Sequence, residues 1–234
     1  MQVKRIVCLA NSFKTHGHCL AGKEYGGTGR WIRPVRGHQT HELFDSDVRY
    51  SRASRMALPL DVMEVRLSAA SPHFYQQENW LIETVRPPLR VLQYEGAFPW
   101  DSLHTIQDKP TKIWIDGDSS TAGVNDRVPE EVARLTIRTS LLLIGLEEFR
   151  MIVGQPGLRF GDHAVKVQGE FVYAGSRHRL QVTDPLAFQY AKGLGMGAHE
   201  IGRTFLTLSL GEAYKGHCYK LIACVLPREP LWTH

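Results

Sequence analysis

Basic and aromatic side chains of the kinds that contact nucleic acid gather near the amino terminus of the chain. Lysine and arginine neutralise phosphates, and aromatic rings stack on unpaired bases. Together they predict a face that binds nucleic acid, DNA or RNA, with a single strand favoured. The alternative is that Trp31 fills the core and the arginines face solvent. The residues of this predicted face are Lys14, Lys23, Tyr25, Arg30, Trp31 and Arg33.

Loops are predicted to bring further groups to the same ligand. Five glycines fall between residues 15 and 29, which predicts a glycine-rich loop after the first strand. Backbone N–H groups of such a loop can approach an anion, but no Gly-Lys-Ser/Thr sequence follows, so a nucleoside triphosphate site is not predicted. Lys215 lies in a hairpin-length loop near the carboxyl terminus and is predicted to face the ligand.

Other residues could carry catalysis or hold a metal. His16, His18 and Cys19 have the side-chain types of a zinc site, although their spacing matches no standard pair of ligand pairs. Cys19 would be a nucleophile only with a distant base such as His217, because neighbours along an extended segment point apart. The alternative function is therefore an enzyme acting on nucleic acid or nucleotides through a Cys/His or metal-assisted site. We assign no catalytic residue, metal or cofactor.

Two further polar groups admit a structural and a functional interpretation. Asp116, Asp118 and Asp126 could hold a hydrolytic metal, yet aspartates in this setting more often form turns. The amide-rich residues 76–79 before Trp80 could read base edges, but we favour a turn that bridges two parts of the chain.

Charge and composition narrow the class of protein. Residues 1–55 hold ten lysines and arginines against four acids, whereas the whole chain has a net charge of only +4, so positive charge is concentrated at one end. That distribution suits a polyanionic partner. No apolar run is long enough for a membrane helix, the start of the chain has no signal-peptide pattern, and the four cysteines form no CxxC pair. We expect a cytoplasmic protein without disulfides and without a membrane partner.

The elements that must position these residues are mainly short strands. Alternating and β-branched runs predict strands at 3–9, 30–35, 59–67, 89–92, 141–146, 164–167, 169–173, 179–182, 204–210 and 218–226. Helices are predicted only at 129–135 and 184–191. The change in texture at 96–135 indicates a connecting segment between one β unit at 1–95 and another at 136–234. Many short strands with glycine-rich turns favour barrels or sandwiches.

Several blocks of the sequence resemble one family of bacterial proteins, the dual OB-containing domain family. The resemblance implies two oligonucleotide-binding (OB) barrels in tandem in a mainly β protein with a few short helices. By analogy with other OB folds it implies nucleic-acid binding, and it implies no particular reaction. The blocks that carry it are 6–14, 19–22, 31–35, 75–80, 125–127, 182–185, 206–212 and 218–221.

Overall fold

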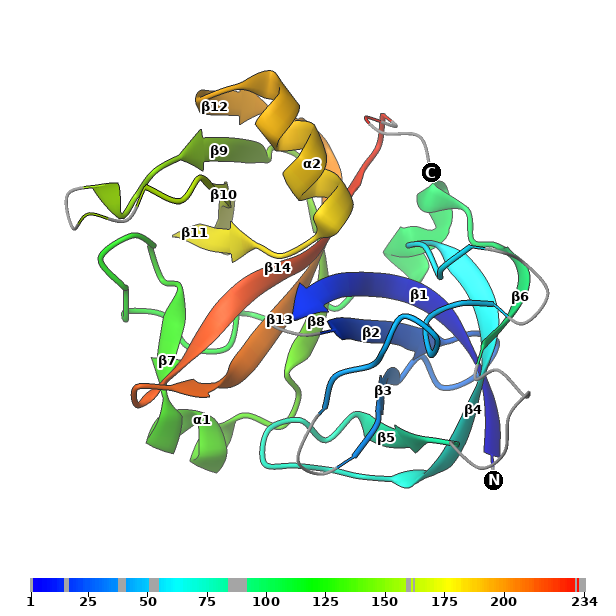
Figure 1. The fold of residues 1–234 in the computed structure, drawn as a ribbon. Helices are drawn as coiled ribbons and strands as arrows, with labels where there is room; N and C mark the ends of the chain where they lie inside the picture. Colours follow the sequence, from blue (N-terminus) through cyan, green and yellow to red (C-terminus); the bar gives the residue numbers. More distant parts are fainter. Residues whose placement is uncertain are drawn as a thin grey trace. The chain divides into compact units, whose positions relative to one another are not determined.

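The computed structural model of the chain describes residues 2–14, 17–37, 41–50, 55–83, 92–158, 161, 163–229 and 231. It divides into two compact units, residues 1–106 and 107–234. Both are built mainly from antiparallel strands (Figure 1). The helices among the described residues are a 3-10 helix, Trp100–Thr105, and two α-helices, α1 (Glu130–Thr136) and α2 (Pro185–Leu194). None of these helices is long and apolar enough to cross a bilayer.

The first unit is a closed five-stranded barrel. Its strands are β1 (Gln2–Lys14), β2 (Gly17–Glu24), β3 (Trp31–Val35), β4 (Asp61–Ala70) and β5 (Asn79–Ile82), with β6 (Leu92–Ala97) added beside β4. The strands follow the order β1-β2-β3-β5-β4, with β3 and β5 parallel, and β4 returns to pair with β1. A five-stranded barrel of this kind is the OB fold.

The barrel closes because β1 is long enough to pair with two neighbours. Its first half pairs with β4 and its second half with β2, and a bulge between Cys8 and Ala10 bends it. Gly22 in β2 lies against this strand, where a Cβ would be 2.2 Å from the carbonyl oxygen of Val7. Only glycine permits so close an approach of the two backbones.

The second unit repeats this order with two interrupted strands. Its elements are β7 (Arg127–Pro129), β8 (Leu141–Leu146), β9 (Arg150–Gly154), β10 (Lys166–Tyr173), β11 (Ser176–Val182), β12 (Gly197–Glu200), β13 (Thr204–Tyr214) and β14 (His217–Pro227). Leu146 pairs with Thr204 and Arg150 pairs with Glu200, so the register between β8–β9 and β12–β13 continues across both breaks. β8–β9 therefore acts as the first strand and β12–β13 as the fourth, and the sheet returns on itself through β10, β11 and β14.

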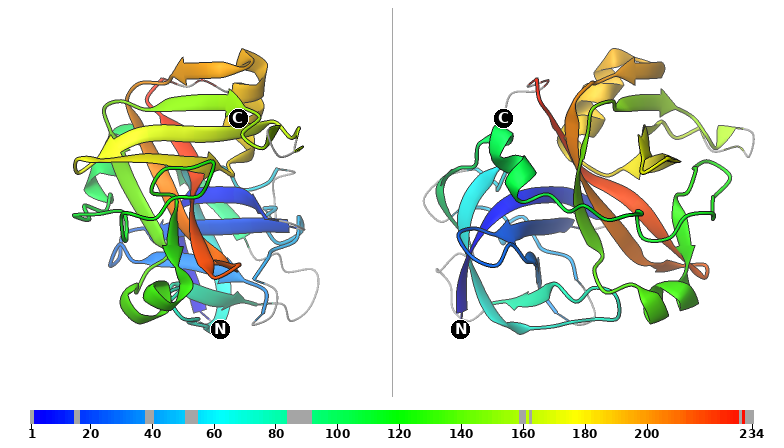
Figure 2. Two further views of the ribbon diagram at one scale, coloured as in Figure 1. Left: turned by 90° about the vertical axis from the view of Figure 1, so that its left-hand side faces the viewer. Right: turned by 180° about the vertical axis from the view of Figure 1, so that it is seen from behind.

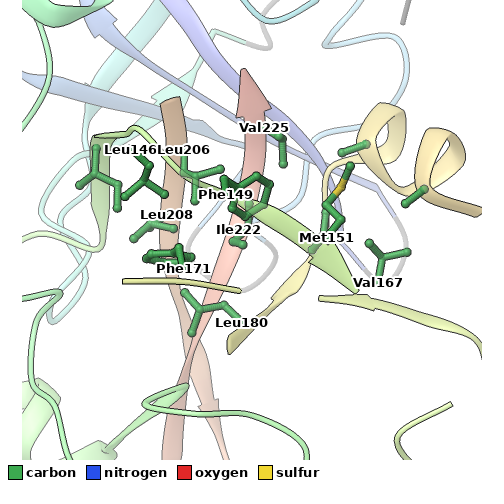
Figure 3. Packing of buried hydrophobic residues seen from close by; sticks show 14 of the residues in the cluster. Leu146, Phe149, Met151, Val167, Phe171, Leu180, Leu206, Leu208, Ile222 and Val225 are labelled. Carbon is green, nitrogen blue, oxygen red and sulfur yellow. The ribbon is translucent and has the colours of Figure 1, made fainter. Parts of the chain in front are cut away.

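The core of the second unit lies between these strands (Figure 3). Apolar side chains from β8, β9, β10, β11, β13 and β14 converge there, among them Met151, Phe171 and Ile222, and Phe149 joins them from the segment between β8 and β9. α2 follows β11 and contacts β9 and β10. The carboxylate of Asp184 begins this helix by accepting from the N–H of Leu186 at 2.9 Å, and it also accepts from a backbone N–H of β14.

The structure confirms the mainly β fold class, and it differs from the predictions made from the sequence in two places. The predicted glycine-rich loop is shorter than expected: residues 17–24 form β2, where the glycines at 17 and 22 lie close to other backbone, whereas residues 25–30, with Gly26, Gly27 and Gly29, form a loop. The segment 96–135 is divided between the units: the 3-10 helix belongs to the first, whereas β7 and α1 belong to the second. Most of the predicted strand at 89–92 lies outside the described residues.

A charged cluster lies inside the second barrel. His178 in β11 is fully buried and stacks on Phe171 with ring centroids 5.3 Å apart. Its Nε2 is 3.8 Å from Oδ1 of Asp116, which is 3.7 Å from Nζ of Lys220. Burial, with the positive charge of Lys220, lowers the pKa of His178 to about 4. Burial also lowers the pKa of Lys220 to about 8, although Asp116 opposes that change.

Gly169 in β10 offers a test of core packing. A Cβ there would lie 2.3 Å from the Ile222 side chain and 2.5 Å from the ring of Phe149. We expect Gly169→Ala to destabilise the protein by about 1–3 kcal/mol through overpacking, measured by urea unfolding. Gly154→Ala in β9 is the matched control, because no heavy atom lies within 4 Å of its added Cβ. Equal stability of the two variants would contradict the packing described here.

The buried ring of His178 predicts a loss of stability in mild acid. The unfolded chain binds a proton there near pH 6.5 and the folded protein only near pH 4, so the unfolded state holds more protons between these values. Stability should therefore fall as the pH drops from about 6.5 to 4, by up to about 3 kcal/mol. His178→Phe keeps a stacking ring and removes the proton site, so its stability should fall less steeply. Urea unfolding across this pH range measures both slopes, and equal slopes would refute the assignment.

Candidate nucleic-acid interface

The residues of the predicted amino-terminal face do not form one exposed surface. Lys23, Trp31 and Arg33 are buried, and Trp31 is only 9% exposed. The Lys23 ammonium donates to the carbonyl of Ile106 at 2.7 Å, and Nη2 of Arg33 donates to Oε1 of Glu78 at 3.0 Å. Side chains enclosed in this way do not reach a phosphate outside the protein. The expectation that these three residues belong to an open basic face is corrected accordingly.

The remaining predicted contacts are scattered. Tyr25 and Arg30 are exposed, and the ring of Tyr25 meets that of Phe98 edge-on at 6.1 Å. Lys215 is exposed in the turn between β13 and β14 of the second unit, with a positive φ of 50°. The side chain of Lys14 lies outside the described part of the chain.

OB folds bind oligonucleotides across the outward face around their second and third strands, and in the first unit this face is closed. Ile32 packs in the core, so its neighbours along β3, Trp31 and Arg33, are on the outward side. Lys23 pairs with Trp31 in register and is therefore outward in β2, as is Ala21. All of these outward residues are buried. The first barrel does not offer this face to a long ligand.

In the second unit the same face is open around Val172 and Arg177, whereas Gln168 and Glu170 on the outward side of β10 are buried. β9, β10 and β11 lie side by side (Figure 2, left). In the strand order of the first barrel, β9 corresponds to the second half of β1, β10 to β2 and β11 to β3. Phe171 and Leu180 point into the core, so Glu170 in β10 and Arg179 in β11 point outward. The outward side chain of Arg177 is 56% exposed.

Three arginines of this face converge on one carboxylate. Oε1 of Glu170 accepts from Arg150 at 2.8 Å, and Oε2 accepts from Arg177 at 2.6 Å and from Arg179 at 2.6 Å. The register explains the arrangement, because Glu170 pairs with Arg150 in β9 and with Arg179 in β11. Oppositely charged residues at paired positions stabilise a sheet. We name Arg150, Glu170, Arg177 and Arg179 the arginine cluster.

The arginine cluster carries a surplus of positive charge. Burial alone would raise the pKa of Glu170, but hydrogen bonds from Arg179 and Arg177 and their charges outweigh it and hold this pKa below its usual value. Glu170 is therefore ionised at neutral pH, and arginine stays protonated in proteins. Three positive charges thus surround one negative charge, with more N–H donors than a single carboxylate accepts. The cluster is suited to an anionic ligand.

A cleft of about 430 Å³ borders the arginine cluster. Arg150 and Arg177 line it, and Lys166 adds a positive charge on the outward side of β10 farther along the face. The cleft also has an acidic edge, formed by Glu147, Glu148 and Glu200. Glu147 is 3.3 Å from Arg203, and Glu200 is 3.7 Å from Arg150. Positive charge therefore favours a polyanion over the strands, while the acidic edge repels it.

The described residues are not arranged as the alternative catalytic or zinc site would require. Both ring nitrogens of His18 lie within 3.1 Å of side-chain oxygens, and Cys19 is partly buried in β2. His16 lies outside the described part of the chain. Within that part, no group of three or more His, Cys, Asp or Glu side chains is placed to hold a metal.

The three aspartates singled out in the sequence have structural partners. Asp126 accepts from the backbone N–H and the hydroxyl of Ser120, which fixes a turn. Asp118 accepts from Nε of Arg127 at 2.9 Å, and Asp116 belongs to the buried cluster inside the second barrel. Asp126 therefore fixes a turn, as the sequence interpretation favoured, whereas Asp116 and Asp118 form ion pairs.

Sequence reasoning missed the arginine cluster, although part of its signal was present. Arg177 and Arg179 alternate with His178 and Leu180, which places both arginines on one side of a strand. The position of Glu170 between them and Arg150 depends on pairings among three strands, which no local pattern reveals.

Comparison of the sequence with protein families agrees with the presence of two barrels of the same strand order. A family model for the dual OB-containing domain matches residues 4–225, which includes the strands of both barrels. Comparisons with curated proteins and with solved structures give no match. The chain, with an OB-ordered barrel in each unit and this family match over nearly its whole length, belongs to the dual OB-containing domain family.

Proposed function

We propose that the protein binds nucleic acid, with single strands favoured, through the outward face of β9, β10 and β11. The observation that carries the proposal is the arginine cluster, which occupies the open OB face of the second unit. Guanidinium groups recognise phosphates through charge-assisted hydrogen bonds and often engage two oxygens at once. Release of counterions from the phosphates adds affinity that does not depend on base sequence.

Glu170 prepares the arginines for this role. Its carboxylate fixes three long side chains that would otherwise lose rotamer freedom on meeting a ligand. Glu170 neutralises one of the three charges and Glu200, which is 3.7 Å from Arg150, neutralises a second, so one positive charge remains to attract phosphate. A ligand thus meets guanidiniums that are already oriented, and Glu170 acts as a positioning residue.

The acidic edge supports the preference for a single strand. A flexible strand can follow the curved outer surface of the barrel over the arginine cluster and toward Lys166 while avoiding Glu147 and Glu148. A stiff duplex placed on the same face would bring phosphates close to the acidic edge. Parallel assays with single-stranded DNA, single-stranded RNA and duplex DNA test this preference.

The salt dependence of binding tests the arginine cluster. We expect Arg177→Gln to weaken binding of a single-stranded oligonucleotide and to flatten the slope of log affinity against log salt by roughly 0.7. Fluorescence anisotropy over a salt series measures both effects. Arg134→Gln is the matched control, since this arginine is half-buried on α1 and pairs with Glu130 rather than with Glu170. A wild-type slope in Arg177→Gln, with thermal unfolding unchanged, would remove the cluster from the interface.

The acidic edge supplies a second test, in which substitution should strengthen oligonucleotide binding rather than weaken it. The double change Glu147→Gln and Glu148→Gln should strengthen oligonucleotide binding several-fold at low salt, because it removes two negative charges beside the path of the phosphates. The gain should shrink at high salt, where exposed charges are screened. Glu131→Gln, which removes an exposed charge from α1, should have no such effect. If the double variant and this control bind alike, the ligand does not pass the cleft.

A further inference from the structure

β12 brings a second carboxylate to the arginine cluster. Its register with β9 sets Glu200 opposite Arg150, whose partner on the other side, in β10, is Glu170. One guanidinium therefore lies between two carboxylates: its Nη2 is 2.8 Å from Oε1 of Glu170, and its Nη1 is 3.7 Å from Oε1 of Glu200. Because Arg179 pairs with Glu170 from β11, charges of alternating sign cross four strands in one row.

The two carboxylates hold Arg150 unequally. The side chain of Glu170 is 5% exposed and meets three guanidiniums, whereas that of Glu200 is 75% exposed. An ion pair between exposed side chains is weak, because water and salt screen it. A phosphate oxygen can therefore replace Glu200 on Arg150 while Glu170 keeps its place. Glu200 thus occupies a position that suits a phosphate of the ligand.

β12 itself is loosely attached to the second barrel. Residues 192–198 and Glu200 are exposed, and none of the four side chains of β12 belongs to the hydrophobic core of the unit. Gly195 before this strand and Gly202 after it have φ angles of 85° and 80°, which glycine adopts without strain. An element with few buried contacts, flanked by small residues, can leave a sheet at little cost.

We propose that residues 195–202, which we name the strap, are autoinhibitory: they hold Glu200 on Arg150 in the place of a phosphate until a nucleic acid displaces them. This inference rests on the function proposed above and adds its regulation. Displacement frees Arg150 for a phosphate oxygen. The carboxyl end of the strap stays joined to the barrel, because the carbonyl of Phe149 accepts from two backbone N–H groups there.

Removal of the carboxylate tests the competition. Glu200→Gln should strengthen binding of a single-stranded oligonucleotide roughly 2- to 5-fold at low salt, the effect of one exposed ion pair. It should also steepen the slope of log affinity against log salt by roughly 0.7, because Arg150 gains a phosphate. In an Arg150→Gln background the same change should have no effect, since the contested guanidinium is gone. Glu131→Gln, at an exposed position of α1, is the matched control, and fluorescence anisotropy measures all of these affinities.

A disulfide between β12 and β9 tests the movement of the strap. Ala198 is exposed and pairs with Ile152, which is only partly buried, so cysteines at both positions lie within reach of a disulfide. The oxidised form of the Ala198→Cys, Ile152→Cys variant should bind several-fold more weakly than its reduced form. The difference should disappear when Glu200→Gln is added. Ile152→Cys alone controls for oxidation of other thiols.

Each outcome bears on the inference. A gain in Glu200→Gln that requires Arg150, with weaker binding by the oxidised variant, supports the autoinhibitory strap. Equal binding by Glu200→Gln and the wild type overturns it, as does a gain that persists without Arg150 or equal binding by the oxidised and reduced forms. The proposed function stands in these cases if Arg177→Gln still weakens binding. Absence of binding by both the wild type and Glu200→Gln overturns the proposed function and the strap together.

Discussion

Closure of each five-stranded ring depends on a first strand that pairs with two neighbours along its length. A single straight strand cannot remain in register with both, because the two partners diverge as the sheet twists around the barrel. The first unit resolves this with a bulge between Cys8 and Ala10, which Gly22 accommodates. The second unit breaks both the first and the fourth strand and joins them at the carbonyl of Phe149, which accepts from the N–H groups of Ile201 and Gly202.

Closure fixes which side of every strand faces the core, and from this the position of the arginine cluster follows. Once Phe171 and Leu180 point inward, Glu170 and Arg179 must point outward, where Arg150 in the next strand meets them. In the first unit the same rule puts Trp31 and Arg33 on the outward side, but that side is buried. The two barrels therefore share a strand order and differ in which surface a ligand can reach.

Electrostatics adds a second constraint. A buried carboxylate is unfavourable unless opposite charges surround it, and Glu170 has three guanidiniums within hydrogen-bonding distance. The same contacts that make its burial tolerable hold the arginines in place and leave positive charge in excess. Arg33 and Glu78 show the contrasting case, since a one-to-one pair inside the first unit leaves no surplus for a ligand. The ratio of arginine to carboxylate is higher in the arginine cluster than in this pair, which is why we propose the cluster, and not the pair, as a binding surface.

The sequence by itself determined the class of fold and much of its local structure. Period-two alternation identified strands such as Asp61–Ala70, and the Asp184-Pro185 start identified α2, because both signals arise from neighbours along the chain. The tertiary structure decided the burial of Lys23, Trp31 and Arg33, the conversion of a glycine-rich segment into β2, and the gathering of the arginine cluster. Each of these depends on contacts between residues far apart in the chain, so the composition of one segment could not reveal them. Charge in the sequence shows that a cation is present, and only the folded sheets determine whether it meets a carboxylate or a ligand.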